Sequence, residues 1–253
     1  MTVQEILERY DAISKSEGES KAGSFLEREC ESYDRDTPED LTGRAALYNE
    51  LGGLYCTAGS YEKSERAFLR ADELLGSSEE LCRSDSRAAV MENLGSLYRL
   101  AGQYDKALKQ FNAVKEIYDE VEVSNDIYAS CISNIGQVYL DAGRAEEAEA
   151  YFKGALTIAQ TDGGLDAGTP EQPKSGDAAD TAEYLSQTVA QLNALVTIGT
   201  SLGGMASARL MRGDSKGAAE LLRQAGERFN SLGGQYAEAG EFFLTKAKEL
   251  GGN

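Results

Sequence analysis

Residues 94–114 read L-G-S-L-Y-R-L-A-G-Q-Y-D-K-A-L-K-Q-F-N-A-V, and this stretch decides the fold. Leu94, Gly95 and Tyr98 fall on one face of a helix, because residues three and four apart lie on the same side. Gly102 ends this helix, and a second apolar face follows. The residues that mark the second face are Ala107, Phe111 and Val114. The stretch therefore predicts two antiparallel helices joined by a tight turn.

The same pattern recurs at the same offsets elsewhere in the chain. One copy consists of Leu51, Gly52, Tyr55, Gly59, Tyr61, Ser64, Phe68 and Ala71. Another consists of Ile135, Gly136, Tyr139, Gly143, Ala145, Ala148, Phe152 and Ala155. A degenerate fourth copy, with Arg209 in place of the tyrosine, consists of Met205, Ala206, Gly213, Ser215, Ala218, Leu222 and Ala225. The chain is therefore built from a repeated helical hairpin.

These residues resemble the tetratricopeptide repeat, whose signature is L-G-x2-Y in the first helix and A-x3-F-x2-A in the second. In that family the small residue lets the two helices approach closely, and the aromatic residue packs against the next unit. No unit buries its apolar face alone, so neighbours stack. The resemblance covers residues 45–159 well and residues 199–232 weakly. It implies an all-α fold, a right-handed α–α superhelix of about five helical hairpins with a C-terminal capping helix.

The spacing of the repeats is longer than the standard period. Gly52 and Gly95 are 43 residues apart, and Gly95 and Gly136 are 41 apart, whereas the standard period is about 34 residues. The extra residues lie between one hairpin and the next, as in residues 76–85. Repeats of about 42 residues resemble those of kinesin light chain and of some bacterial peptide-binding repeat proteins.

The pattern divides the chain into five regions. They are an N-terminal hairpin that caps the solenoid or binds a partner (1–36), three clear repeats (37–160), a Gly- and Pro-rich flexible loop (161–180), a degenerate fourth hairpin (181–232) and a C-terminal capping helix (233–253). We expect Thr37 to cap the helix that follows it, with Pro38 in the first turn, and Ser78 to cap the next helix. We also expect glycines to kink or break the long helical stretch over residues 181–212. These glycines are Gly199, Gly203 and Gly204.

Composition excludes several classes of function. The 253 residues include 25 basic and 43 acidic residues, a net charge of −18, which argues against binding to nucleic acid or to anionic membranes. A basic partner or simple solubility fits this charge. No signal-peptide core and no run of 18 apolar residues occur, so we expect a cytoplasmic protein. The four cysteines lie in predicted helices without a C-x2-C pair, which favours buried free thiols over a disulfide or metal site. They are Cys30, Cys56, Cys82 and Cys131.

The sequence offers little material for catalysis. It contains no histidine, which removes the commonest general base and the histidine-dependent nucleophiles. It has neither a phosphate-binding loop nor a dinucleotide-binding motif. Acid pairs such as Glu146 with Glu147 are better explained as solvated helix faces. We therefore predict a protein that is not an enzyme, with no cofactor and no metal.

The resemblance points to a ligand groove on the concave side, which the first helices of the repeats line. The candidate groove residues are Asn49, Glu50, Glu92, Asn93, Ser96, Arg99, Ser133, Asn134, Gln137 and Asp141. Asn93 and Asn134 occupy the same sixth position of successive repeats, and Asn49 lies one position earlier. An amide side chain carries a donor and an acceptor, so it can pair with an extended peptide backbone of any sequence. The alternative is that these asparagines face solvent or a neighbouring helix.

The groove composition narrows the partner. Family members that grip a C-terminal carboxylate use lysine at the second position of the repeat. Here that position holds Ala46, Ala89 and Ser130, and the only cation among the candidates is Arg99. We therefore predict a module that binds a protein or peptide, neutral or basic, in the groove. Two alternatives stay open: a scaffold that self-associates as a homodimer through an end helix, and a peptide-signal sensor that acts through another chain.

Overall fold

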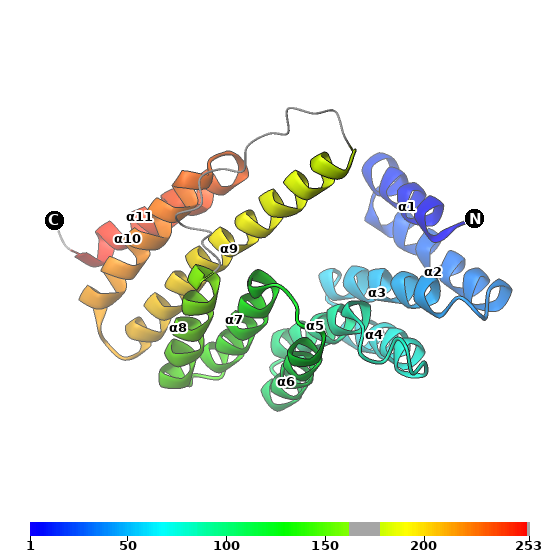
Figure 1. Ribbon diagram of the computed structural model, residues 1–253, viewed down its shortest axis with the longest axis horizontal. Helices are drawn as coiled ribbons and strands as arrows, with labels where there is room; N and C mark the ends of the chain where they lie inside the picture. Colours follow the sequence, from blue (N-terminus) through cyan, green and yellow to red (C-terminus); the bar gives the residue numbers. More distant parts are fainter. Residues whose placement is uncertain (162–177, 252–253) are drawn as a thin grey trace. The chain divides into compact units, whose positions relative to one another are not determined.

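The computed structural model describes residues 1–161 and 178–251, and within them the chain forms eleven α-helices and one short 3-10 helix (Figure 1). The predicted flexible loop, 161–180, lies mostly outside the described residues. The helices are α1 (Val3–Glu17), α2 (Glu19–Asp36), α3 (Leu41–Thr57), α4 (Tyr61–Gly76), α5 (Asp85–Leu100), α6 (Tyr104–Val121), α7 (Asn125–Asp141), α8 (Ala145–Thr161), α9 (Ala178–Met211), α10 (Ser215–Leu232) and α11 (Ala237–Gly251). The described chain is all-α and its helices pack in sequential pairs, which confirms the predicted repeat fold.

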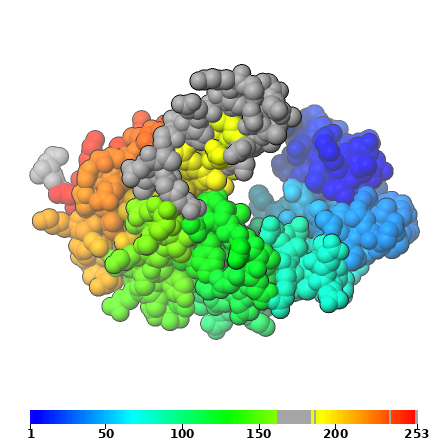
Figure 2. Space-filling view, viewed as in Figure 1, coloured from blue at the N-terminus to red at the C-terminus, as the bar shows by residue number. Residues whose placement is uncertain are grey.

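The helices form two compact units, Met1–Val121 and Glu122–Asn253. In the first unit the pairs are α1–α2, α3–α4 and α5–α6, and the first helices of neighbouring pairs also touch, α1 against α3 and α3 against α5. These pairs appear in chain order as adjacent bands from blue to green in the space-filling view (Figure 2). In the second unit α7 pairs with α8 and α9 with α10, while α11 packs on α10. Each unit is therefore a short stack of hairpins.

The hairpin turns follow the glycine rule of the repeat. Gly59, Gly102, Gly143 and Gly213 have φ angles of 71°, 71°, 77° and 82°, the left-handed conformation that ends a helix without penalty for glycine. The residue after each glycine donates its backbone N–H to a carbonyl five residues earlier, as Ser60 does to Tyr55 at 2.8 Å. The degenerate fourth copy keeps this bond, from Asp214 to the Arg209 carbonyl at 2.9 Å.

A contact between glycine and phenylalanine closes each clear repeat. A Cβ atom on Gly52 would lie 2.6 Å from the Phe68 ring, and one on Gly95 would lie 3.0 Å from the Phe111 ring. Gly136 makes the same approach to Phe152, whose ring also lies against Gly204 of α9. The phenylalanine thus packs on its own hairpin and, in the second unit, on the next one as well.

Two predicted helix caps are wrong. The N-cap of α3 is Asp40, whose carboxylate accepts the Gly43 N–H at 2.8 Å. Thr37 instead ends α2, where its hydroxyl donates to the Tyr33 carbonyl at 2.7 Å. Likewise the cap of α5 is Ser84 and not Ser78. In both places several cap-forming residues stand close together, and the local pattern does not decide between them.

The predicted break in the long helix is also wrong. α9 runs unbroken through 34 residues, because its glycines receive aromatic rings instead of turning the chain. Phe229 lies against Gly199, and Phe243 of α11 lies against Gly203. This packing outweighs the poor helix propensity of glycine. Despite the length of α9, no described helix combines the length and apolar character needed to cross a membrane.

The cysteines differ in their surroundings. Cys30 and Cys131 are buried, whereas Cys56 and Cys82 are partly exposed. Burial raises the pKa of the Cys30 thiol to about 12, so this residue behaves as an apolar core side chain. Cys82 lies in the turn before α5, contrary to its predicted helical position.

Candidate peptide-binding face

The candidate residues lie on the first helices of the repeats, which are α1, α3 and α5 in the first unit and α7 and α9 in the second. We call the side formed by α1, α3 and α5 the first-helix face. In the first unit α3 carries Asn49 and Glu50, and the neighbouring helix α5 carries Glu92, Asn93, Ser96 and Arg99. In the second unit α7 carries Ser133, Asn134, Gln137 and Asp141. All ten residues retain some exposure to solvent. Each unit therefore presents its own group of candidates.

The asparagines of the first unit form a pair across two helices. The Asn93 Nδ2 donates to the Asn49 Oδ1 at 2.9 Å, and the bond is exposed. Neither the Asn49 Nδ2 nor the Asn93 Oδ1 makes a hydrogen bond with any described residue, so one donor and one acceptor stay available. The sequence placed these residues on one face, but it did not predict the bond between them.

Glu92 is partly buried in the first-helix face. Its Oε1 is buried and has no hydrogen-bond partner among the described residues. Burial raises the pKa of Glu92 to about 7, although a hydrogen bond from Tyr118 of α6 opposes the shift. Glu92 can therefore exchange a proton near neutral pH, and it can accept a donor from a ligand that reaches it.

The α1–α3 side of the face is acidic. Burial, and then the neighbouring Asp11 carboxylate of α1, raise the pKa of Glu50. Burial raises the pKa of Tyr10 as well, with further contributions from Glu19 and Glu50. The two helices thus bring like charges together, and a cationic group would relieve their repulsion.

On the second unit the candidates are partly engaged with neighbours. Gln137 donates to Asp141 at 2.7 Å along α7. Ser133 accepts the Ser201 hydroxyl of α9 at 3.5 Å, so it faces the neighbouring helix. Asn134 keeps a half-buried amide at the position that Asn93 occupies in the first unit. Of the four residues, Asn134 resembles the first-unit candidates most.

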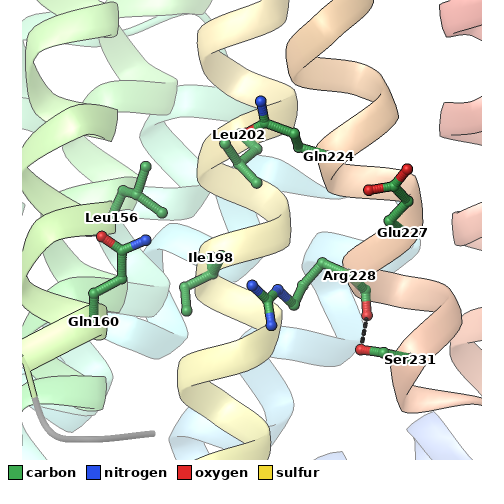
Figure 3. A pocket seen from close by; sticks show the side chains of 8 residues that line it. All are labelled: Leu156, Gln160, Ile198, Leu202, Gln224, Glu227, Arg228 and Ser231. Carbon is green, nitrogen blue, oxygen red and sulfur yellow. Dashed lines mark hydrogen bonds between the residues drawn. The ribbon is translucent and has the colours of Figure 1, made fainter. Parts of the chain in front are cut away.

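Sequence reasoning missed a pocket of about 330 Å³ in the second unit, between α8, α9 and α10 (Figure 3). The lining residues are Leu156 and Gln160 of α8, Ile198 and Leu202 of α9, and Gln224, Glu227, Arg228 and Ser231 of α10. Three of the lining side chains are aliphatic, and the other five are polar or charged. The signal available in the sequence was the degeneracy of the fourth repeat, which contributes two of the three helices.

The family comparison identifies the repeats. Residues 43–120 and 86–161 match the family profile described as tetratricopeptide repeat. No curated protein sequence matches the chain significantly. The profile match covers the three clear copies of the sequence pattern and the turns that separate them.

Solved structures share the fold at low sequence identity. A putative kinesin light chain from Podosopora anserina with nearly identical TPR-like repeats has a TM-score of 0.64 at 15% identity, over 89% of this chain and 94% of that one. A variant of the same protein has a TM-score of 0.66 at 16% identity, over 91% and 95%. BtubC (BKLC) from P. vanneervenii has a TM-score of 0.51 at 17% identity, over 92% and 90%. At these identities the similarity concerns the fold alone, and the neighbours are kinesin light chain-like repeat proteins.

Proposed function

Because the chain is a tetratricopeptide repeat protein, we propose that it binds an extended peptide or a helix of a partner protein along the first-helix face. Domains of this family generally mediate interactions between proteins. The face has the chemistry that such binding needs, namely exposed amides beside acidic groups on adjacent helices. The proposal does not require catalysis or a cofactor.

The observation that carries the proposal is the bond between Asn49 and Asn93. Each amide uses one group to bind the other, so the pair keeps one donor and one acceptor for a ligand. A peptide backbone offers the complementary carbonyl and N–H along its length. A preorganised pair of this kind lowers the entropic cost of binding.

The charges on the face favour a neutral or basic ligand. Burial, and then the nearby Asp11 carboxylate, raise the pKa of the Glu50 carboxyl. Glu92 has a buried oxygen without a hydrogen-bond partner among the described residues. A lysine or arginine side chain would supply the missing donors and reduce the repulsion. The net charge of −18 would accelerate association with a basic chain.

A peptide-display selection tests the proposal. The full chain is used to select peptides from a random library, and the affinity of the strongest binder is measured by calorimetry with wild type and with Asn49→Ala/Asn93→Ala. The double variant should bind weaker by roughly 1–3 kcal/mol in total, since it leaves backbone groups of the peptide unpaired. Asn112→Ala, which removes an exposed amide from the second helix α6, is the matched control and should bind like wild type. Unchanged affinity in the double variant would reject the role of the asparagines.

A second candidate function, self-association, is favoured by one residue. Phe242 of α11 is 57% exposed, and aromatic residues are enriched in interfaces between proteins. Sedimentation at two protein concentrations compares wild type with Phe242→Ser. A dimer that forms in wild type and not in the variant would support a scaffold, whereas a monomer at both concentrations would reject it.

A further inference from the structure

Partly buried ion pairs join neighbouring hairpins of the first unit, at contacts that we call seams. Arg44 of α3 donates through Nε to Asp34 of α2 at 2.6 Å, and Arg87 of α5 donates through Nε to Asp72 of α4 at 2.7 Å. Each arginine also donates to a carbonyl of the preceding turn: Arg44 to Pro38 at 2.5 Å, and Arg87 to Cys82 at 2.8 Å. A long charged side chain thus binds both the preceding helix and the turn that follows that helix.

The second unit has different residues at the same repeat positions. Arg44 and Arg87 stand eight residues before Gly52 and Gly95, and the residue eight before the corresponding Ala206 is Ile198. Asp72 follows Phe68 by four residues, as Leu156 follows Phe152. The pocket of about 330 Å³ lies at this seam, and Leu156, Ile198 and Leu202 are its aliphatic lining residues. The shorter aliphatic pair leaves open the space that an arginine fills elsewhere.

Arg228 gives this pocket a positive charge. Arg228 lies six residues after Leu222, which occupies the repeat position of Phe68 and Phe111. Six residues after these phenylalanines, the first unit has the buried apolar residues Leu74 and Ile117. The side chain of Arg228 reaches from α10 toward Ile198 (Figure 3). The guanidinium makes no hydrogen bond or ion pair with any residue in the described ranges. The one carboxylate that lines the pocket, Glu227, is already paired with Arg223.

We propose that this pocket binds an apolar group that carries a carboxylate. The aliphatic part would lie on Leu156, Ile198 and Leu202, and the carboxylate would pair with Arg228 in the fork geometry that guanidinium favours. The ligand would supply the acid that Asp34 and Asp72 supply at the first-unit seams. The pocket of about 330 Å³ has room for an acid of six to eight carbons. The proposal is independent of peptide binding on the first-helix face.

Two sources offer this chemistry, a free aliphatic acid and the C-terminal leucine of a peptide. Calorimetry on the full chain compares hexanoate with hexanamide, and acetyl-Gly-Gly-Leu bearing a free carboxylate with its C-terminal amide. Each acid that fits should bind at least about tenfold tighter than its amide. Binding of hexanoate alone would assign a free acid, and binding of both acids would include chain ends. The absence of heat for both acids at millimolar concentration would overturn the proposal.

Three variants test whether Arg228 binds the carboxylate of the ligand. Arg228→Gln should abolish the preference for hexanoate over hexanamide, because the amide side chain keeps the size but loses the positive charge. Leu156→Asp places an acid at the position of Asp72, so it should pair with Arg228 and exclude hexanoate. Lys216→Gln removes an exposed charge from the same helix and should bind like wild type.

Thermal unfolding followed by circular dichroism verifies that each variant is folded. If Leu156→Asp does not fold, Arg228→Gln alone decides the test. A preference for hexanoate that persists in folded Arg228→Gln would overturn the proposal.

Discussion

Besides the seams, neighbouring hairpins share a second contact, which we call the junction. The two units build the junction at the same repeat positions but with different side chains. In each junction a donor on the first helix of one hairpin binds a glutamate on the second helix of the preceding hairpin. The pairs are Tyr55 with Glu27 and Tyr98 with Glu65 in the first unit, and Arg209 with Glu149 in the second. The distance is 2.8 Å from Tyr98 and 2.9 Å from Arg209. The degenerate repeat therefore lost the signature tyrosine while it kept a donor of similar reach.

The seams differ more strongly between the units than the junctions do. The second unit has Ile198 and Leu156 where the first unit has an arginine and an aspartate. In a solenoid each hairpin contacts only its neighbours, so the stability of one interface depends little on the chemistry of another. One seam can hold a charged pair while a second holds aliphatic side chains and a pocket. Exchange of residues between the units therefore tests which contacts the repeat requires.

The largest effect should come from the phenylalanine that joins two hairpins. Phe152 is 2% exposed and contacts Gly136 and Gly204. Phe152→Ala should lower the free energy of unfolding by about 4 kcal/mol, because it empties space on both sides of α8. Leu222→Ala, at the corresponding position of the fourth repeat, should cost about 3 kcal/mol. Urea denaturation followed by circular dichroism measures both, and a larger loss for Leu222→Ala would contradict the bridging role of Phe152.

The seam of the first unit gives the next effect. Arg44 is 9% exposed, and Arg44→Ala should cost about 3 kcal/mol because it leaves the Asp34 carboxylate partly buried without its main partner. Arg44→Ile combined with Asp34→Leu copies the second unit, and it should recover most of the loss since no charge stays unpaired. Hydrogen exchange of α2 and α3 reports the local stability. A double variant as unstable as Arg44→Ala would mean that the fold requires the ion pair.

The sequence predicted the hairpins because each signature residue has a steric task that a motif can record. Gly52 must lack a side chain where Phe68 approaches, and Gly59 must adopt a left-handed turn. The offsets between such residues depend only on helix geometry, so they are visible without a structure. The continuity of α9 was missed for a related reason, because Gly203 accommodates a ring from α11, which is distant in the sequence.

Features that depend on how neighbouring helices face each other were beyond the sequence. The bond between Asn49 and Asn93 requires the rotation of α3 and α5 about their axes, which the pattern does not specify. To predict the pocket near Arg228, one must know how α8, α9 and α10 pack and that their side chains leave space between them. The choice of Asp40 over Thr37 as a cap depends on where α2 ends, which its own composition leaves undefined.

The free energy of unfolding should depend on pH through Glu92, a residue of the first unit that has no acidic counterpart in the second. Glu92 occupies the repeat position that Ser133 occupies in α7, and its pKa of about 7 in the folded chain lies above the ordinary 4.5. Between these values only the folded state holds the proton, so the free energy of unfolding should fall as pH rises. We expect a loss of about 2 kcal/mol between pH 5 and pH 8, measured by urea denaturation. Glu92→Gln should remove this part of the slope, while Glu116→Gln, an exposed carboxyl on α6, should keep it. Equal slopes in wild type and Glu92→Gln would contradict the assignment.

The smallest effect concerns the donor at the hairpin junction. Tyr98→Phe removes one hydroxyl and should lower the free energy of unfolding by about 1 kcal/mol, the typical value for one hydrogen bond at a partly exposed site. Glu65 also contacts Lys106 at 3.5 Å, which limits the loss. Tyr98→Arg places the donor of the second unit in the first and should stay closer to wild type than Tyr98→Phe. If arginine is instead the more damaging of the two, the aromatic ring under Lys106, 4.8 Å from the ammonium, matters more than the hydrogen bond. The two substitutions thus distinguish the contribution of ring packing from that of the hydrogen bond. They do so at a repeat position where the first unit has a tyrosine and the second an arginine.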